Sequence, residues 1–145
     1  MKVYAFGEEN APVILLLPGT CCHWKGNFGH VIPLLSDEYR VLCVSYDGFD
    51  ETERTEFPTM LEETAKIEDY LKVNCGGHIR AAYGCSLGGA CLTRLLALGE
   101  LPGKRAIIDG GITHAGVAER VCAQMHVHVP IFGMVKDDRH RTRAR

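Results

Sequence analysis

The chain has 145 residues, which fits a single domain. Hydrophobic residues make up 46% of it and the formal net charge is −2, so the composition argues against disorder and against a general attraction to nucleic acid or anionic membranes. The longest apolar run, residues 11–19, is too short to cross a bilayer, and the N-terminus lacks the basic-then-apolar pattern of a signal peptide.

The first predicted strand, residues 2–6, alternates between apolar and polar side chains. The second, residues 13–17, is a continuous apolar run that suits a strand buried on both faces. Turn-forming residues separate the two, so we expect them to form a hairpin. A third strand is expected at residues 39–46.

A helix is predicted to begin at Thr59, because Thr59 and Glu62 have the spacing of a capping box. Its apolar side chains recur at helical spacing until Gly76 and Gly77 end it. The later expected elements, in order, are a strand at 78–83, a helix at 86–99, a strand at 104–109, a short helix at 117–125 and a strand at 127–135. This alternation predicts an α/β fold with a mostly parallel sheet and helices on both faces.

A serine stands where the fourth predicted strand turns into a helix, in Gly84-Cys85-Ser86-Leu87-Gly88. A sharp turn there would force Ser86 into strained backbone angles and lift its hydroxyl above the sheet, and glycines on either side would relieve the crowding. The N–H of Leu87 would then face an oxyanion formed at the serine. The alternatives are an unreactive serine in a tight turn, and Cys85 as nucleophile, although Cys85 is off the centre of the motif.

The second predicted strand ends in Pro18-Gly19-Thr20, with Trp24 shortly after. The N–H of Thr20 is a candidate second oxyanion donor, since such a hole combines an N–H after the nucleophile with one from an earlier strand end. The alternatives are an ordinary turn and a core aromatic residue.

From about Val13 to about Asp109 the chain resembles the α/β-hydrolase family, in the order and spacing of these motifs. Pro18 is a departure, since many members carry histidine there. The resemblance implies that Ser86 is the nucleophile and that Thr20 and Leu87 supply the oxyanion hole. It also implies a single hydrolase-like domain over residues 1–145 that is incomplete at its C-terminus, because a further strand, a catalytic-histidine loop and a closing helix would follow.

In this family the acid follows the serine, and the histidine follows the acid. Residues 128–140 are similar to a strand that leads to the catalytic aspartate, which makes Asp138, or Asp137, the candidate acid. Asp109 is a second candidate, because some members place the acid one strand earlier. The alternative for Asp137 and Asp138 is a charged loop in water. No downstream histidine stands where the base is expected; those considered are His114, His126, His128 and His140.

Seven scattered cysteines without an export signal predict reduced thiols in a cytoplasmic protein. Cys21 and Cys22 precede His23, but no C-x-x-C pair completes a tetrahedral site, so we expect no metal. We expect no organic cofactor either, since the sequence has no dinucleotide or P-loop motif.

The sequence therefore predicts a serine hydrolase acting on an ester, thioester or related acyl bond of a small molecule, weak or inactive for want of a base. The alternative is a non-catalytic binding module, or a homo-oligomer formed through an exposed sheet edge. Basic side chains near the C-terminus could contact nucleic acid, but a solvated tail fits the acidic balance better, so we expect no nucleic-acid partner. They are Lys136, Arg139, Arg141, Arg143 and Arg145.

Overall fold

The structure, a computed structural model, describes residues 1–98, 105–110 and 127–128. Its six strands are β1 (Lys2–Phe6), β2 (Val13–Leu17), β3 (Arg40–Ser45), β4 (Ala81–Cys85), β5 (Ala106–Asp109) and β6 (Val127–His128). Its helices are α1 (Trp24–Phe28), α2 (Ile32–Leu35), α3 (Met60–Cys75) and α4 (Leu87–Ala97). No helix in this described part is long and apolar enough to span a membrane.

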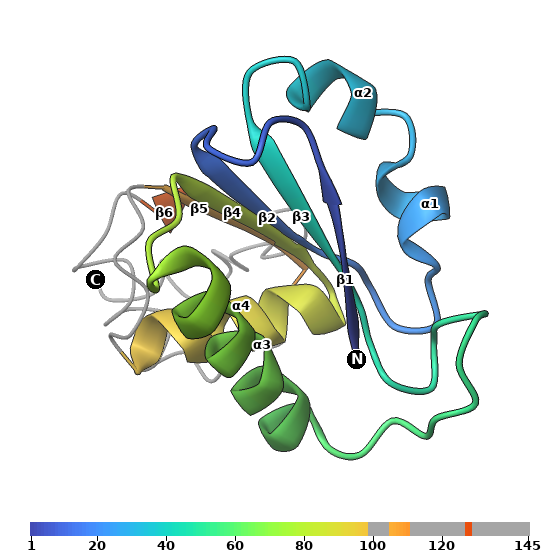
Figure 1. The fold of residues 1–145 in the computed structure, drawn as a ribbon. Coiled ribbons are helices and arrows are strands. Elements are labelled where there is room, and N and C mark those ends of the chain that lie inside the picture. The colour runs from blue at the N-terminus through green and yellow to red at the C-terminus, as the bar shows by residue number, and fades with distance from the viewer. Residues whose placement is uncertain (99–104, 111–126, 129–145) are drawn as a thin grey trace, which may run out of the picture.

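The strands form one sheet in the order β1-β3-β2-β4-β5-β6 (Figure 1). β1 runs antiparallel to β3, and every other neighbouring pair is parallel. The predicted mostly parallel sheet is therefore confirmed, and Val127 and His128 pair parallel with β5, as expected for the start of that strand.

The predicted hairpin between the first two strands is wrong, because β3 lies between β1 and β2. The physical reason is burial. The run Val13–Leu17 is apolar on both faces and takes a central place with parallel partners on each side. β1 is only partly buried and takes the edge.

Helices cover both faces of the sheet, as predicted. α1 and α2 lie on one side, and α3 and α4 lie on the other (Figure 1). Alternate residues of β2 serve the two cores: Leu15 and Leu17 face α3 and α4, whereas Leu16 packs with Trp24 and Phe28. Trp24 is thus a core aromatic residue.

The capping box is confirmed at the start of α3. The Glu62 N–H donates to the Thr59 hydroxyl at 3.2 Å, and that hydroxyl donates to the Glu62 carboxylate at 2.8 Å. α3 ends at Gly76, whose φ of 56° is left-handed. The short helices α1 and α2 were not anticipated, since neither is long enough to show an apolar period.

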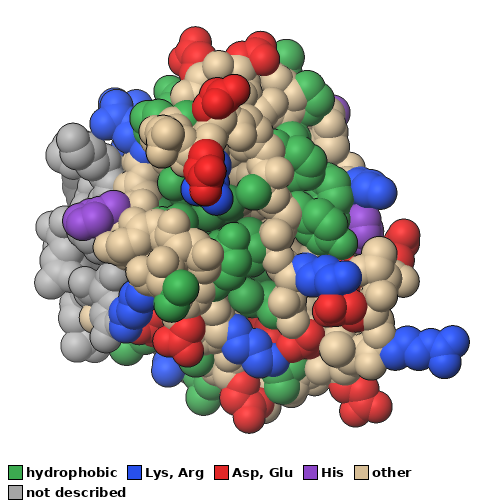
Figure 2. All heavy atoms as spheres, in the orientation of Figure 1, with side chains coloured by type: hydrophobic (Ala, Val, Ile, Leu, Met, Phe, Trp, Pro, Cys, Tyr) green, Lys and Arg blue, Asp and Glu red, His purple; other side chains and the backbone are tan. Residues whose placement is uncertain are grey.

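On the face seen in Figure 2, hydrophobic side chains gather near the centre, and acidic and basic side chains are interspersed around them. Several expectations lie outside the described residues. They are the helix at 117–125, the strand beyond 128, the roles of His114, His126, His140, Asp137 and Asp138, and the basic C-terminal side chains.

Candidate active site

Ser86 stands between β4 and α4 with φ 50° and ψ −113°, and it is exposed. A left-handed φ is costly for any residue other than glycine, so the predicted backbone strain is confirmed. A serine at the start of a helix ordinarily caps it with its side chain. Ser86 makes no such bond. Its hydroxyl is therefore free for other partners.

The two flanking glycines have the steric role that the sequence predicted. A Cβ on Gly84 would lie 2.3 Å from the carbonyl oxygen of Gly88, and a Cβ on Gly88 would lie 2.1 Å from that of Leu17. Both contacts are to backbone atoms, which cannot move aside cheaply. The strand and the helix can approach this closely only because both positions lack a side chain.

Backbone contacts orient the strand–helix turn at residues 84–88, which we call the elbow. The Ser86 N–H donates to the carbonyl oxygen of Asp109 at 2.7 Å, and the Ala90 N–H donates to that of Ser86 at 3.0 Å. Leu87 is the first residue of α4. N–H groups in the first turn of a helix have no intrahelical acceptor and lie at its positive end. The Leu87 N–H is thus one of these donors, directly after Ser86.

Next to the elbow lies a turn closed by the Cys22 N–H, which donates to the carbonyl oxygen of Gly19 at 3.3 Å. A Cβ built on Gly19 would be 3.6 Å from the Ser86 Cβ and 3.7 Å from the Cys22 sulfur. We call residues 19–22 the oxyanion turn, after the role that the sequence predicts for Thr20. Thr20 is exposed in it, and Cys21 has a left-handed φ of 55°.

Two side chains that sequence reasoning missed hold the residues just before Thr20. The Tyr46 hydroxyl donates to the carbonyl oxygen of Pro18 at 3.0 Å. The Asn27 Oδ1 atom accepts a hydrogen bond from the Gly19 N–H at 3.2 Å. A bond from one side chain to a distant backbone group leaves no pattern in the sequence.

Asp109 ends β5 opposite Cys85 of β4. Its Oδ2 atom accepts a hydrogen bond from the Tyr83 hydroxyl at 2.8 Å. Burial raises the pKa of Tyr83, and the carboxylate of Asp109 raises it further, so the phenol stays protonated and donates. The sheet thus brings Asp109 beside Ser86, with its carboxylate already bonded to Tyr83.

Cys85 is poorly suited to be the nucleophile. Burial raises the pKa of its thiol, and the charges of Asp109 and the neighbouring Cys22 raise it further. A thiol must ionise to attack, so these surroundings oppose its reaction near neutral pH.

No histidine in the described part of the chain hydrogen-bonds to Ser86. Those with described side chains are His23, His30 and His78. His23 accepts the N–H of Lys25 at 3.3 Å and caps α1. His128 lies in β6, paired with Ile107. Across the described residues, no three His, Cys, Asp or Glu side chains form a group that could hold a metal ion.

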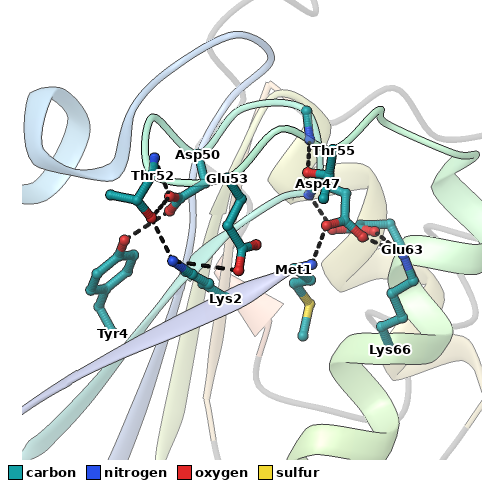
Figure 3. Close-up of polar contacts among 11 residues, drawn as sticks. Met1, Lys2, Tyr4, Asp47, Asp50, Thr52, Glu53, Thr55, Glu63 and Lys66 are labelled. Atoms are coloured by element: carbon teal, nitrogen blue, oxygen red, sulfur yellow. Dashed lines mark hydrogen bonds and ion pairs between the residues drawn. The ribbon is translucent and has the colours of Figure 1, made fainter.

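A buried ionic cluster holds the loop after β3 (Figure 3). Glu63 is fully buried and accepts the Asp47 N–H at 2.8 Å. Lys66 pairs with both carboxylates, and the N-terminal ammonium of Met1 pairs with Asp47. Burial acts to raise the pKa of Asp47, but hydrogen bonds and charges from Lys66 and the N-terminus lower it to about 2. These carboxylates have structural partners and are not candidate acids.

Sequence reasoning also missed this cluster, although a signal was present. Glu63 precedes Ile67 by four residues and Leu71 by eight, which places it on the buried face of α3. A carboxylate on an apolar stripe is buried only with a partner.

An open groove of about 470 Å³ lies between α1–α2 and the sheet. It is mostly apolar, with Phe28, Tyr83 and Ile107 among its walls and Asn27 at its border. Ser86 is not among the residues that line it.

The sequence profile of the alpha/beta hydrolase family matches residues 14–144. This chain belongs to the alpha/beta hydrolase family. Similar solved structures support this assignment. An alpha/beta hydrolase family protein from Desulfitobacterium hafniense is 27% identical, with a TM-score of 0.71 over 77% of this chain and 44% of that one.

Two further structures share the alpha/beta hydrolase fold. A serine hydrolase from Cycloclasticus zankles is 21% identical, with a TM-score of 0.66 over 76% of this chain and 41% of that one. An enol-lactonase from Burkholderia xenovorans is 22% identical, with a TM-score of 0.61 over 74% of this chain and 42% of that one. The chain thus spans less than half the length of these solved relatives.

A different similarity is short. Over 38 residues the chain is 51% identical to the UvrABC system protein C of Caldanaerobacter subterraneus, which is 26% of this chain and 6% of that protein. UvrABC system protein C of Acetivibrio thermocellus is 43% identical over the same length.

Proposed function

We propose that this member of the alpha/beta hydrolase family is a serine hydrolase that cleaves an ester, thioester or related acyl bond. The observation that carries the proposal is Ser86: an exposed serine in a strained, left-handed conformation between a strand and a helix, with no capping bond from its hydroxyl. Such strain persists only where the surroundings enforce it, and it is concentrated at functional sites.

In the proposed reaction, the Ser86 oxygen attacks the substrate's carbonyl carbon while a base takes the hydroxyl proton. The carbonyl oxygen becomes an oxyanion, and the N–H groups of Thr20 and Leu87 stabilise it. The leaving group departs with a proton, and water then releases the acyl group from Ser86.

We propose Asp138 as the acid that orients the base, with Asp137 as its alternative. The parallel pairing of Val127 with Ala106 supports this, since a strand continued from there runs toward the same sheet edge as Ser86. Asp109 is the second candidate, and the Tyr83 hydroxyl already bonds to its Oδ2 atom.

The solved neighbours suggest which substrates to test first. They include the enol-lactonase from Burkholderia xenovorans and a meta-cleavage product hydrolase from Pseudomonas fluorescens. A lactone and a meta-cleavage product are therefore the first substrates to test on this chain, beside an activated ester. We carry no activity over from UvrABC system protein C, because the similarity spans 6% of that protein.

A fluorophosphonate probe tests the nucleophile directly. We expect it to label the purified protein at Ser86, to label Cys85→Ala equally, and to leave Ser86→Ala unlabelled. With no described histidine bonded to Ser86, we expect only slow hydrolysis of p-nitrophenyl acetate, at most about 10³–10⁴-fold above water. Labelling that persists in Ser86→Ala would refute the assignment. A wild-type protein that never labels would instead favour the non-catalytic binding module.

A further inference from the structure

A single peptide bond precedes the proposed oxyanion donor, and both of its polar atoms are held by side chains. The carbonyl oxygen belongs to Pro18 and is held by the Tyr46 hydroxyl at 3.0 Å. The N–H belongs to Gly19 and is held by the Asn27 Oδ1 atom at 3.2 Å. We propose that Tyr46 and Asn27 are positioning residues that fix this peptide and thereby aim the Thr20 N–H at Ser86, an inference that rests on the proposed function.

The first step of the argument concerns the peptide plane. A peptide unit is planar, so its carbonyl and N–H point in opposite directions. Tyr46 directly follows β3 and Asn27 comes from α1, and the two side chains bond to opposite ends of the peptide unit. Two bonds to opposite ends prevent the unit from rotating about its Cα–Cα axis. The next N–H along the chain is that of Thr20.

The second step concerns burial. Pro18 and Gly19 are buried and lie past the end of β2, where ladder partners stop. A buried polar group without a partner is costly. The Tyr46 and Asn27 side chains supply the hydrogen-bond partners that a neighbouring strand would otherwise provide. Tyr46 is itself fully buried. Burial raises the pKa of its hydroxyl, so the group remains a neutral donor.

The third step concerns flexibility. Gly19 has the freest backbone of any residue type, and it is the hinge between the held peptide and Thr20. Cys21, two residues on, has the strained φ of 55°. A turn with both features keeps one shape only if its surroundings determine it. The Cys22 N–H closes the turn at Gly19, and the two side chains fix its entry.

Labelling kinetics test whether the bonds act on the site. We would compare the wild type with Asn27→Leu, which keeps the side-chain volume beside an apolar groove, and with Tyr46→Phe, which removes only the hydroxyl. We expect each to react with the fluorophosphonate about tenfold more slowly, less than the roughly 10²–10³-fold cost of losing a donor outright. For a turned-over ester, kcat should fall with KM unchanged. The double variant should be less than additive, since both bonds hold one peptide.

Asn74→Leu and Tyr70→Phe are the matched controls, because both lie on α3, away from the turn. They should label at the wild-type rate. Circular dichroism establishes that every variant is folded. Wild-type labelling rates in both folded Asn27→Leu and Tyr46→Phe would overturn the proposal.

A second measurement does not depend on activity. In a protein of 16.0 kDa, NMR can follow exchange of the Gly19 amide. We expect exchange at least about tenfold faster in Asn27→Leu than in the wild type, with protection kept in Asn27→Asp, which retains an acceptor oxygen. Faster exchange without slower labelling would show that the bond is merely structural and would also overturn the proposal. If the wild type is not labelled at all, the nucleophile assignment fails. Separately, Gly19 exchange that is unchanged in Asn27→Leu would refute the proposal that Asn27 fixes this peptide.

Discussion

Two sharp turns meet at the carboxyl edge of the sheet, and different forces hold them. Packing holds the elbow at Ser86, where Cβ atoms on Gly84 and Gly88 would lie 2.3 and 2.1 Å from backbone oxygens. The oxyanion turn has more room, since a Cβ on Gly19 would meet its neighbours at 3.6 to 3.8 Å. Hydrogen bonds define its shape instead. An added side chain in a close-packed turn forces the backbone apart, whereas a substitution in a hydrogen-bonded turn removes one bond at a time. We therefore expect substitutions to destabilise the protein more at the elbow than at the oxyanion turn.

The largest expected effect is at Gly88. Gly88→Ala would place a methyl group 2.1 Å from the carbonyl oxygen of Leu17, so β2 and α4 must separate. We expect the free energy of unfolding to fall by about 3 kcal/mol or more, measured by urea denaturation. Gly26→Ala is the control, because a Cβ there meets nothing within 4 Å and Gly26 lies inside α1. It should be neutral or stabilising by up to about 1 kcal/mol. Wild-type stability in Gly88→Ala would contradict the packing account.

The elbow could be predicted from the five residues 84–88 because its geometry depends only on neighbours in the sequence. The strain at Ser86 and the crowding at Gly84 and Gly88 follow from a strand that turns at once into a helix. The pairing of β1 could not be predicted in this way. Turn-forming residues after β1 predict that the chain reverses direction, but they do not predict which strand will pair with β1.

Tyr46 and Asn27 show a second limit of sequence reasoning. Each is an ordinary residue whose role depends on a backbone group 28 or 8 residues earlier in the chain. Nothing in local spacing encodes such a contact. Glu63 differs, because its place on the apolar stripe of α3 was visible in the sequence.

Ion pairs hold a third turn at the same edge, the loop after β3 that contains Asp47. Its stability should therefore depend on pH. The folded pKa of Asp47 is about 2, below its unfolded value. Its stabilising contribution is therefore complete above the unfolded pKa of about 3.9 and is lost as the pH falls toward 2, by about 2 kcal/mol. Urea denaturation between pH 7 and pH 2.5 measures this loss.

Asp47→Asn should lose that part of the acid sensitivity and keep the part due to Asp50. Burial acts to raise the pKa of Asp50, but hydrogen bonds from Thr52, Ser45 and Tyr4 lower it overall. An Asp47→Asn variant with the full wild-type pH dependence would show that the cluster does not hold this turn.

A smaller effect is expected from relieving strain in the oxyanion turn. Cys21→Gly removes the Cβ that makes a φ of 55° costly, and we expect it to raise the free energy of unfolding by about 0.5–1 kcal/mol. Cys21→Ala keeps the Cβ and should gain nothing. The parallel change Ser86→Gly should also stabilise, but it should abolish fluorophosphonate labelling. Equal stability of Cys21→Gly and Cys21→Ala would mean that strain is absent.

The smallest expected change in stability is at Gly19. Its backbone is outside the left-handed region, and an added methyl group would make ordinary contacts. Gly19→Ala should alter the free energy of unfolding by less than about 0.5 kcal/mol. Because that methyl would lie 3.6 Å from the Ser86 Cβ, labelling of Ser86 should nevertheless slow several-fold. A destabilisation as large as that of Gly88→Ala would erase the distinction between the two turns.

The pairing of β1 with β3 constrains how this chain can fold during synthesis. β1 is synthesised before its partner, which begins at Arg40, and β2 lies on the far side of that partner in the sheet. At about 5–20 residues per second, β1 therefore waits seconds for a neighbour. Pairings that are distant in sequence also form slowly, because a long loop must close first. β1 can therefore join the sheet only after β3 has been synthesised.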